Sequence, residues 1–179
     1  MIIIYANMTI NEGVKAGIYG EGALMKDSNL DIETTIRKFH GDDAPAIIEI
    51  LKLNGQYSHP IVDGPEAMSK VSKNPSVVFL VSEIDGIIIG SVRGIYDGSR
   101  ALIHQITVHP NWQGKGIGTK LIKNIASEFR DRGAPTISVT AGKSEKWDSI
   151  EFFEKLGFED MPIKLMIHFD INELIKELK

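Results

Sequence analysis

Residues 109–119 read HPNWQGKGIGT, with glycine at every second position from Gly114 to Gly118. An apolar run that ends at Val108 precedes them, and a segment with helical hydrophobic spacing follows. Glycine loses more conformational freedom on folding than any other residue and weakens a helix or strand relative to alanine. Three glycines at a strand-to-helix junction therefore indicate that something comes close to the backbone there.

The composition is that of an ordinary globular domain. The chain has 179 residues, of which 42% are hydrophobic and 25% charged. This length is enough for one domain with a full core and does not by itself indicate two domains. The net charge of −4 weighs against a nucleic-acid partner, because such proteins usually carry a basic excess to neutralise phosphates. The same acidic balance permits a cationic acceptor.

Cysteine is absent from the sequence. Disulfides, thiolate metal sites and a cysteine nucleophile are thereby excluded together. The opening MIIIYANMTI, residues 1–10, has no basic region, and its apolar run is too short for a signal peptide or a membrane span. We expect a cytoplasmic protein with no membrane partner.

The centre of the chain reads as β-structure. The β-branched runs 77–81 and 87–89 are joined through Asp85-Gly86, a strong hairpin signal because such a turn needs positive φ at both positions. A second turn at 97–99 leads into a third apolar run, residues 101–108. These segments predict a meander of three antiparallel strands.

Helical spacing begins directly after the glycines. One face of the segment is apolar, while Gly133 and Pro135 predict its end. The apolar face consists of Ile117, Leu121, Ile122, Ile125 and Phe129. The other expected elements are a strand over 32–39, a helix entered through Asp43 and Pro45, a polar loop over 54–65, a short helix over 66–72, a strand over 136–140, a helix over 150–156, a strand over 163–169 and a helix over 171–178.

This order predicts a mixed α/β fold of the α+β type, with a largely antiparallel central sheet. Residues 1–30 show no sustained period, and we expect an N-terminal extension of uncertain structure there. Residues 31–179 are expected to form a single domain.

The glycine turn has the features of an anion site. The first amide N–H groups of a helix have no partner inside it, and the helix dipole adds about half a positive charge at that end. Glycine places no Cβ between a phosphate and these amides, and Lys115 adds a nearby charge. The alternative is a tight connection whose glycines only satisfy backbone geometry.

Two common phosphate motifs do not fit the spacing. A dinucleotide fingerprint starting at Gly114 needs glycine at position 119, where Thr119 stands. A P-loop ending at Gly142-Lys143-Ser144 needs glycine at position 137, where Ile137 stands. Neither a Rossmann site nor a P-loop is expected.

Two stretches resemble landmarks of the GNAT superfamily of N-acetyltransferases. Gln113-x-x-Gly116-x-Gly118 resembles the family's Q/R-x-x-G-x-G/A signature, and residues 153–158, FEKLGF, resemble its Y-x-K-x-G-F landmark. The resemblance covers about residues 32–169. It implies acetyl transfer from acetyl-coenzyme A to a primary amine by direct attack, in a fold with helices on both sheet faces and a splayed strand pair that admits the coenzyme.

The resemblance also implies positions for the cofactor. The pyrophosphate would lie on backbone amides of the turn, and the pantetheine arm along the main chain of the preceding strand, with the Val108 N–H facing the thioester oxygen. A fixed amide aimed at a developing oxyanion stabilises a tetrahedral transition state. The implied cofactor-binding residues are Ile106, Thr107, Val108, Gln113, Gly114, Lys115, Gly116, Ile117, Gly118 and Thr119.

The acid and base are less clearly marked. His104 is the candidate base, since strand alternation puts it on the same side as Ile106 and Val108 and histidine titrates near neutral pH; a packed strand histidine is the alternative. Phe153 stands where the family usually has a tyrosine acid, and a phenyl ring donates no proton. A non-catalytic acyl-coenzyme A sensor on the same fold is therefore the alternative function.

No metal is expected, because the histidines show no metal-ligand spacing. The expected partner is a small-molecule or peptide amine. A homodimer is compatible with the sequence, which names neither the acceptor nor the oligomeric state.

Overall fold

The computed structural model describes residues 33–142, 148–162 and 170–178. In this part of the chain one sheet of five strands runs in the order β1-β2-β3-β4-β5. The first four strands are antiparallel neighbours, and β5 is parallel to β4. The strands are β1 (Thr35–Lys38), β2 (Val77–Ile84), β3 (Ile87–Tyr96), β4 (Ala101–Val108) and β5 (Ile137–Val139).

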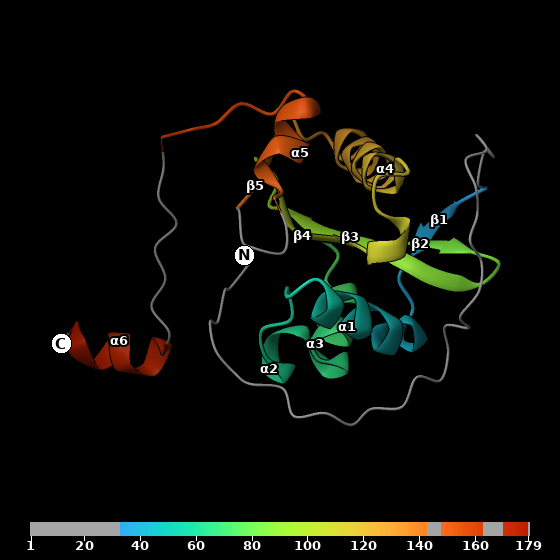
Figure 1. The fold of residues 1–179 in the computed structure, drawn as a ribbon. Helices are drawn as coiled ribbons and strands as arrows, with labels where there is room; N and C mark the ends of the chain where they lie inside the picture. Colours follow the sequence, from blue (N-terminus) through green and yellow to red (C-terminus); the bar gives the residue numbers. More distant parts are fainter. Residues whose placement is uncertain (1–32, 143–147, 163–169, 179) are drawn as a thin grey trace.

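Helices cover both faces of the sheet, with α1 to α3 on one side and α4 and α5 on the other (Figure 1). Short 3-10 helices precede α1 and α4. The α-helices are α1 (Ala44–Leu53), α2 (Pro60–Asp63), α3 (Pro65–Ser72), α4 (Ile117–Asp131), α5 (Ile150–Lys155) and α6 (Ile171–Glu177), and the 3-10 helices are η1 (Gly41–Asp43) and η2 (Pro110–Trp112).

Each face of the sheet has its own hydrophobic core. The apolar stripe of α4 packs on buried residues of β2, β3 and β4, and Leu121 and Ile125 are fully buried there. On the other face Ile47, Ile50 and Met68 pack against β2. The spacing of apolar residues in α4 and the alternation in the strands therefore determine which side of each element faces inward.

The predicted mixed, largely antiparallel sheet with helices on both faces is confirmed. The expectation of a loop over 54–65 is wrong at its end, where α2 forms because His59 accepts a hydrogen bond from the Ile61 N–H and proline occupies the first turn. The expected strand over 163–169 and the extension over 1–30 lie outside the described residues. The division into an extension and one domain stays a prediction.

The pairing of β4 with β5 is short. Only Ala101, Leu102 and Ile103 have partners on β5, which ends at Val139. In the described part of the chain, the remaining five residues of β4 have no neighbouring strand on that side. The predicted splayed strand pair is thus present beside the glycine turn.

An ion pair fastens β1 to the start of α1. Arg37 donates from both terminal nitrogens to Asp43, each over 2.8 Å, and the His40 N–H donates to the same carboxylate. Burial acts to raise the pKa of Asp43, but these hydrogen bonds outweigh it and lower that pKa below its ordinary value. Asp43 therefore stabilises the fold above the pKa of an unfolded aspartate, and this stability is lost as the pH falls through the lower, folded-state pKa.

We expect Asp43→Asn to lower the free energy of unfolding by about 2 kcal/mol at pH 7, since it removes a charge-assisted, bidentate acceptor. The loss should shrink below about pH 4, where the wild-type carboxylate is itself becoming protonated. Urea titrations at neutral and acidic pH measure both values. Asp131→Asn is the control, because its pair with Arg130 is exposed and contributes little; an equal loss in both variants would contradict the assignment.

Candidate active site

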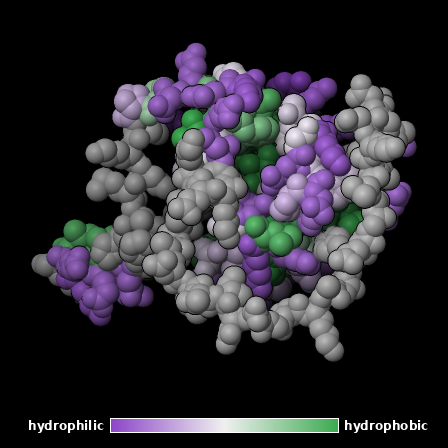
Figure 2. Space-filling model, viewed as in Figure 1, coloured by the Kyte–Doolittle hydropathy of each residue, from purple (hydrophilic) through white to green (hydrophobic). Residues whose placement is uncertain are grey.

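A cavity of about 420 Å³ lies where β4 has separated from β5. It is bounded by the segment after α1, the end of β4, the glycine turn and the start of α5. Figure 2 shows hydrophobic side chains in a hollow between α4 and α5. All residues predicted to bind the cofactor line this cavity except Lys115, and His104 is also outside the lining.

The end of β4 turns one row of backbone groups toward the cavity. The His109 N–H donates to the Ile89 carbonyl over 2.8 Å, so alternation points the N–H and C=O of Ile106 and Val108 away from β3. The Ile106 carbonyl accepts a hydrogen bond from Gln56 Nε2 over 3.2 Å on this side. The strand thus presents the backbone N–H groups of Ile106 and Val108 to an extended group that enters the gap, while the carbonyls on this side accept from side-chain amides.

Asn54, directly after α1, joins the strand to the turn. Its Nδ2 donates to the Val108 carbonyl over 2.9 Å and to Thr107 Oγ1 over 2.8 Å. Its Oδ1 accepts from Gln113 Nε2 over 3.1 Å. Gln113 Nε2 also donates to the Val108 carbonyl over 2.9 Å. One side chain therefore contacts both the end of β4 and the first residue of the turn.

The turn gives α4 an exposed N-terminal end. Gly114 and Gly116 have φ of +73° and +78°, in the left-handed region that other residues occupy at a cost. A Cβ on either would meet nothing within 4 Å. The backbone conformation therefore calls for glycine at both positions, and the space above the first amides of α4 is free for an anion.

Gly118 has a different role from the other two glycines. A Cβ there would lie 3.1 Å from Cζ of Phe152, whose ring lines the cavity. The missing side chain makes room for α5 to pack on the first turn of α4. The sequence attributes all three glycines to a phosphate that comes close to the backbone. In the structure Gly118 also allows two helices to pack together.

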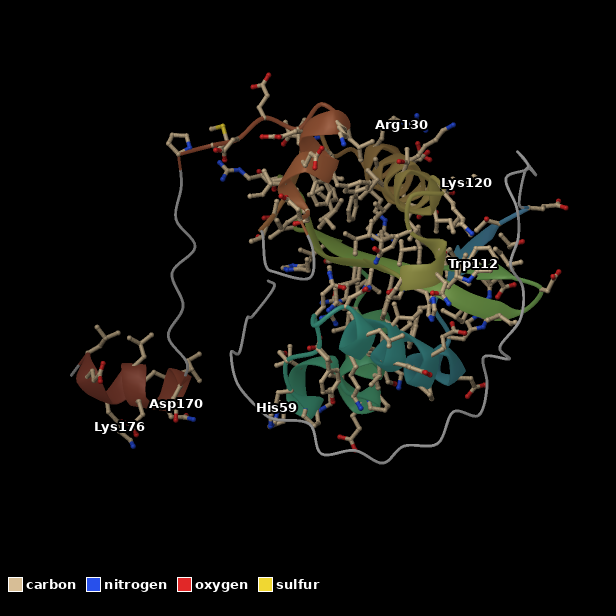
Figure 3. All side chains as sticks on the ribbon, viewed as in Figure 1. His59, Trp112, Lys120, Arg130, Asp170 and Lys176 are labelled. Carbon is tan, nitrogen blue, oxygen red and sulfur yellow. The ribbon has the colours of Figure 1, made fainter. Side chains whose placement is uncertain are left out.

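Lys115 lies beside Trp112. Its ammonium group is 4.8 Å from the centre of the indole ring, within the range of a cation–π contact. Figure 3 shows Trp112 on η2 beside the N-terminal end of α4. Trp112 lines the cavity and packs on the core, so the cavity wall next to the turn is aromatic, and a positive charge lies next to that ring.

His104 lies at an irregularity of β4. Arg93 pairs with Gln105 and Gly94 with Ile103, so His104 is the extra residue of a β-bulge in β4. The bulge interrupts the period of two between Ile103, which packs in the α4 core, and Gln105, which donates to Asp63 on the other face. That His104 lies on the same side as Ile106 and Val108 therefore stays a prediction.

Burial lowers the pKa of His104 below its ordinary value, and the positive charge of Arg93 acts in the same direction as a smaller cause. The imidazole is therefore neutral at pH 7, the form that a general base requires.

Phe153 is buried in the core, with edge contacts to Phe152 and Phe158. Ser149, whose carbonyl accepts from the Phe153 N–H, carries a hydroxyl and lines the cavity. It donates to the Gly142 carbonyl over 2.8 Å and accepts from the Gly142 N–H over 2.9 Å. The position of the family's tyrosine is thus part of the core, and the serine hydroxyl is bonded to backbone.

Sequence reasoning did not single out several cavity residues, namely Asn54, Gln56, Asp148, Ser149 and Phe152. In the sequence, Asn54 is the first residue of the expected polar loop. Its contact with Val108 joins positions 54 apart in the chain, and no local pattern announces such a contact. Phe152 was visible only as the neighbour of Phe153.

Among the described residues, there is no cluster of three or more His, Cys, Asp or Glu side chains that could hold a metal ion. None of the helices in this part of the chain combines the length and the apolar character needed to cross a membrane.

The described fold and cavity can be compared with known proteins. The model of the acetyltransferase (GNAT) family matches residues 44–158. An acetyltransferase of Pectobacterium atrosepticum is 34% identical over 127 residues, which are 69% of this chain and 86% of that protein.

Two solved structures have a similar fold. A transcriptional regulator from Bacillus halodurans has a TM-score of 0.66 at 25% identity, covering 76% of this chain and all of that one. The PaiA N-acetyltransferase from Thermoplasma acidophilum, in complex with coenzyme A, has a TM-score of 0.66 at 18% identity, covering 74% and 93%.

An α/β fold with a splayed strand pair beside a glycine turn defines the class of protein. The chain belongs to the GNAT acetyltransferase family. This membership supports acetyl transfer that depends on an acyl-coenzyme A in general terms.

Proposed function

We propose that the protein is an N-acetyltransferase that moves acetyl from acetyl-coenzyme A to a primary amine by direct attack in a ternary complex. One observation carries this proposal: one cavity connects the part of β4 beyond its pairing with β5 to the N-terminal end of α4. An extended amide-bearing arm and a pyrophosphate are the two chemical parts that such a cavity accommodates.

The turn would hold the pyrophosphate through the amides of residues 113–119, where the space above Gly114 and Gly116 is free. The β4 edge at Ile106, Thr107 and Val108 would hold the pantetheine arm. When bound, acetyl-coenzyme A supplies an activated thioester carbonyl.

In this arrangement the Val108 N–H donates to the oxygen that gains charge as the amine attacks. The new bond joins the amine nitrogen to the acetyl carbon, and the bond from that carbon to sulfur breaks. Binding both reactants side by side removes much of the entropic barrier.

His104 is the proposed base that takes the proton lost by the attacking amine, directly or through a water. Its lowered pKa keeps it neutral at pH 7. No proton donor is proposed for the leaving thiolate, because Phe153 has no hydroxyl; the thiolate leaves unassisted or takes a proton from water.

Two observations favour a second function. Phe153 replaces the family's usual tyrosine acid, and a similar structure is named a transcriptional regulator. An acyl-coenzyme A sensor without efficient catalysis would use the same cavity. Turnover separates the two functions, since both predict binding.

We expect saturating acetyl-coenzyme A to raise the melting temperature, because a ligand that binds only the folded state stabilises it. A screen of amines that includes peptides with free N-termini, polyamines and aminoglycosides should then release coenzyme A thiol with at least one acceptor. Binding without release from any amine would favour the sensor, and the absence of any thermal shift would contradict both functions.

Gly116→Ala should weaken coenzyme A binding by about tenfold or more, since a Cβ enters the proposed pyrophosphate space and strains the turn. Gly86→Ala is the matched control: Gly86 also has φ of +78° and open space around its Cβ, but lies in the β2–β3 turn. Both variants should lose about 1 kcal/mol of stability. Calorimetric titration with coenzyme A would refute the turn assignment if the two variants bound equally well.

His104→Gln should lower the rate of acetyl transfer and leave the affinity for coenzyme A nearly unchanged. In the wild type the rate should rise with pH through an apparent pKa below 6.5 and then level off, because the neutral imidazole is the active form. The variant should lack this rise. A pH profile identical to that of the wild type would remove His104 from the mechanism.

A further inference from the structure

The Val108 carbonyl is held by two side-chain amides at once. Asn54 Nδ2 and Gln113 Nε2 each donate to it over 2.9 Å. A carbonyl oxygen has two lone pairs, so these bonds fill its capacity. Among the described residues no strand pairs with this carbonyl on that side, and the two amides fix it.

The orientation of the Asn54 amide follows from its partners. The Val108 carbonyl only accepts, so the nitrogen of Asn54 must face it. The oxygen is then left for Gln113, whose nitrogen lies 3.1 Å away. The buried Thr107 hydroxyl, 2.8 Å from the Asn54 nitrogen, completes the set.

Asn54 is well placed to impose this geometry on its partners. Its own N–H donates to the Ile50 carbonyl over 3.0 Å and closes α1, and Ile50 and Leu51 in the last turn of this helix are fully buried. The side chain therefore projects from a packed helix end. Its contacts transmit that rigidity to the end of β4.

We propose that Asn54 is a positioning residue for acyl transfer: it holds the Thr107–Val108 segment so that the Val108 N–H keeps one direction, and it ties this strand end to the glycine turn through Gln113. The inference rests on the proposed function, in which that N–H meets the thioester oxygen. Such a donor acts through preorganisation, so a donor that turns freely loses most of its effect. Asn54 substitutes here for the strand pairing that β5 no longer provides.

The test uses the full chain and two variants that lack the amide, Asn54→Ala and Asn54→Leu. Asn54 has φ of −85°, which both residues adopt without strain, and leucine keeps most of the volume. Asn124→Ala is the control, because that exposed amide donates to the carbonyl of Lys120 in its own helix and is not among the residues that line the cavity. Melting temperatures establish that all three variants are folded.

The first readout needs no acceptor. In ¹⁵N-labelled wild-type protein, the Val108 amide resonance should differ between the acetyl-coenzyme A and coenzyme A complexes, since only the former carries the thioester carbonyl. Both Asn54 variants should lose most of this difference, while their dissociation constants for coenzyme A stay nearly unchanged. The Asn124→Ala control should keep the difference at Val108. With an acceptor from the amine screen, kcat should fall about tenfold or more in both variants.

The outcomes distinguish a failure of the proposed function from a failure of the role given to Asn54. A wild type without the acetyl-dependent difference at Val108 would contradict the proposed function and this inference with it. If the wild type shows the acetyl-dependent difference at Val108 and the Asn54 variants show the same difference, the inference alone is overturned. Equal losses in coenzyme A affinity and in kcat would also overturn it, because Asn54 would then build the binding site rather than aim the donor.

Discussion

The architecture of the site depends on a pairing that stops early. β4 and β5 run parallel for three residues and then separate. Backbone N–H and C=O groups are strong hydrogen-bonding groups, and leaving them without partners away from water costs free energy. The separation therefore creates a row of groups that need partners, in a gap bounded by two helices.

The second constraint is the place where α4 begins. Its apolar stripe is buried along the sheet, so the position of its N-terminal end is determined by core packing. Two left-handed glycines turn the chain sharply enough to begin the helix next to the end of β4. The partial positive charge of the helix end and the strand edge consequently border one cavity.

Local features of the fold were predictable because their causes are local. The hairpin at Asp85-Gly86 follows from turn conformation, and indeed Asp85 has φ of +51° and Gly86 of +78°. The period of α4 likewise predicted its buried face. The glycine turn was found for the same reason, since strained backbone conformations leave a trace in residue type.

Other features depend on register and on distant packing. The bulge at His104 arises from how β3 and β4 pair, and no period of two within β4 records it. The Asn54 amide meets Val108 only because α1 packs across the sheet. The close fit of Gly118 and Phe152 likewise joins two elements that are separated in the chain by β5. Such contacts become visible only in three dimensions.

The side-chain amides at the end of β4 also bear on self-association. An unpaired strand edge is a template on which another chain can add a strand, with aggregation as the consequence. Here the outward carbonyls of Ile106 and Val108 already accept from Gln56, Asn54 and Gln113. A foreign strand would have to displace these amides before it could donate to the edge, whereas a ligand that accepts from the backbone N–H groups would not. The same three side chains thus make the edge selective for what it pairs with.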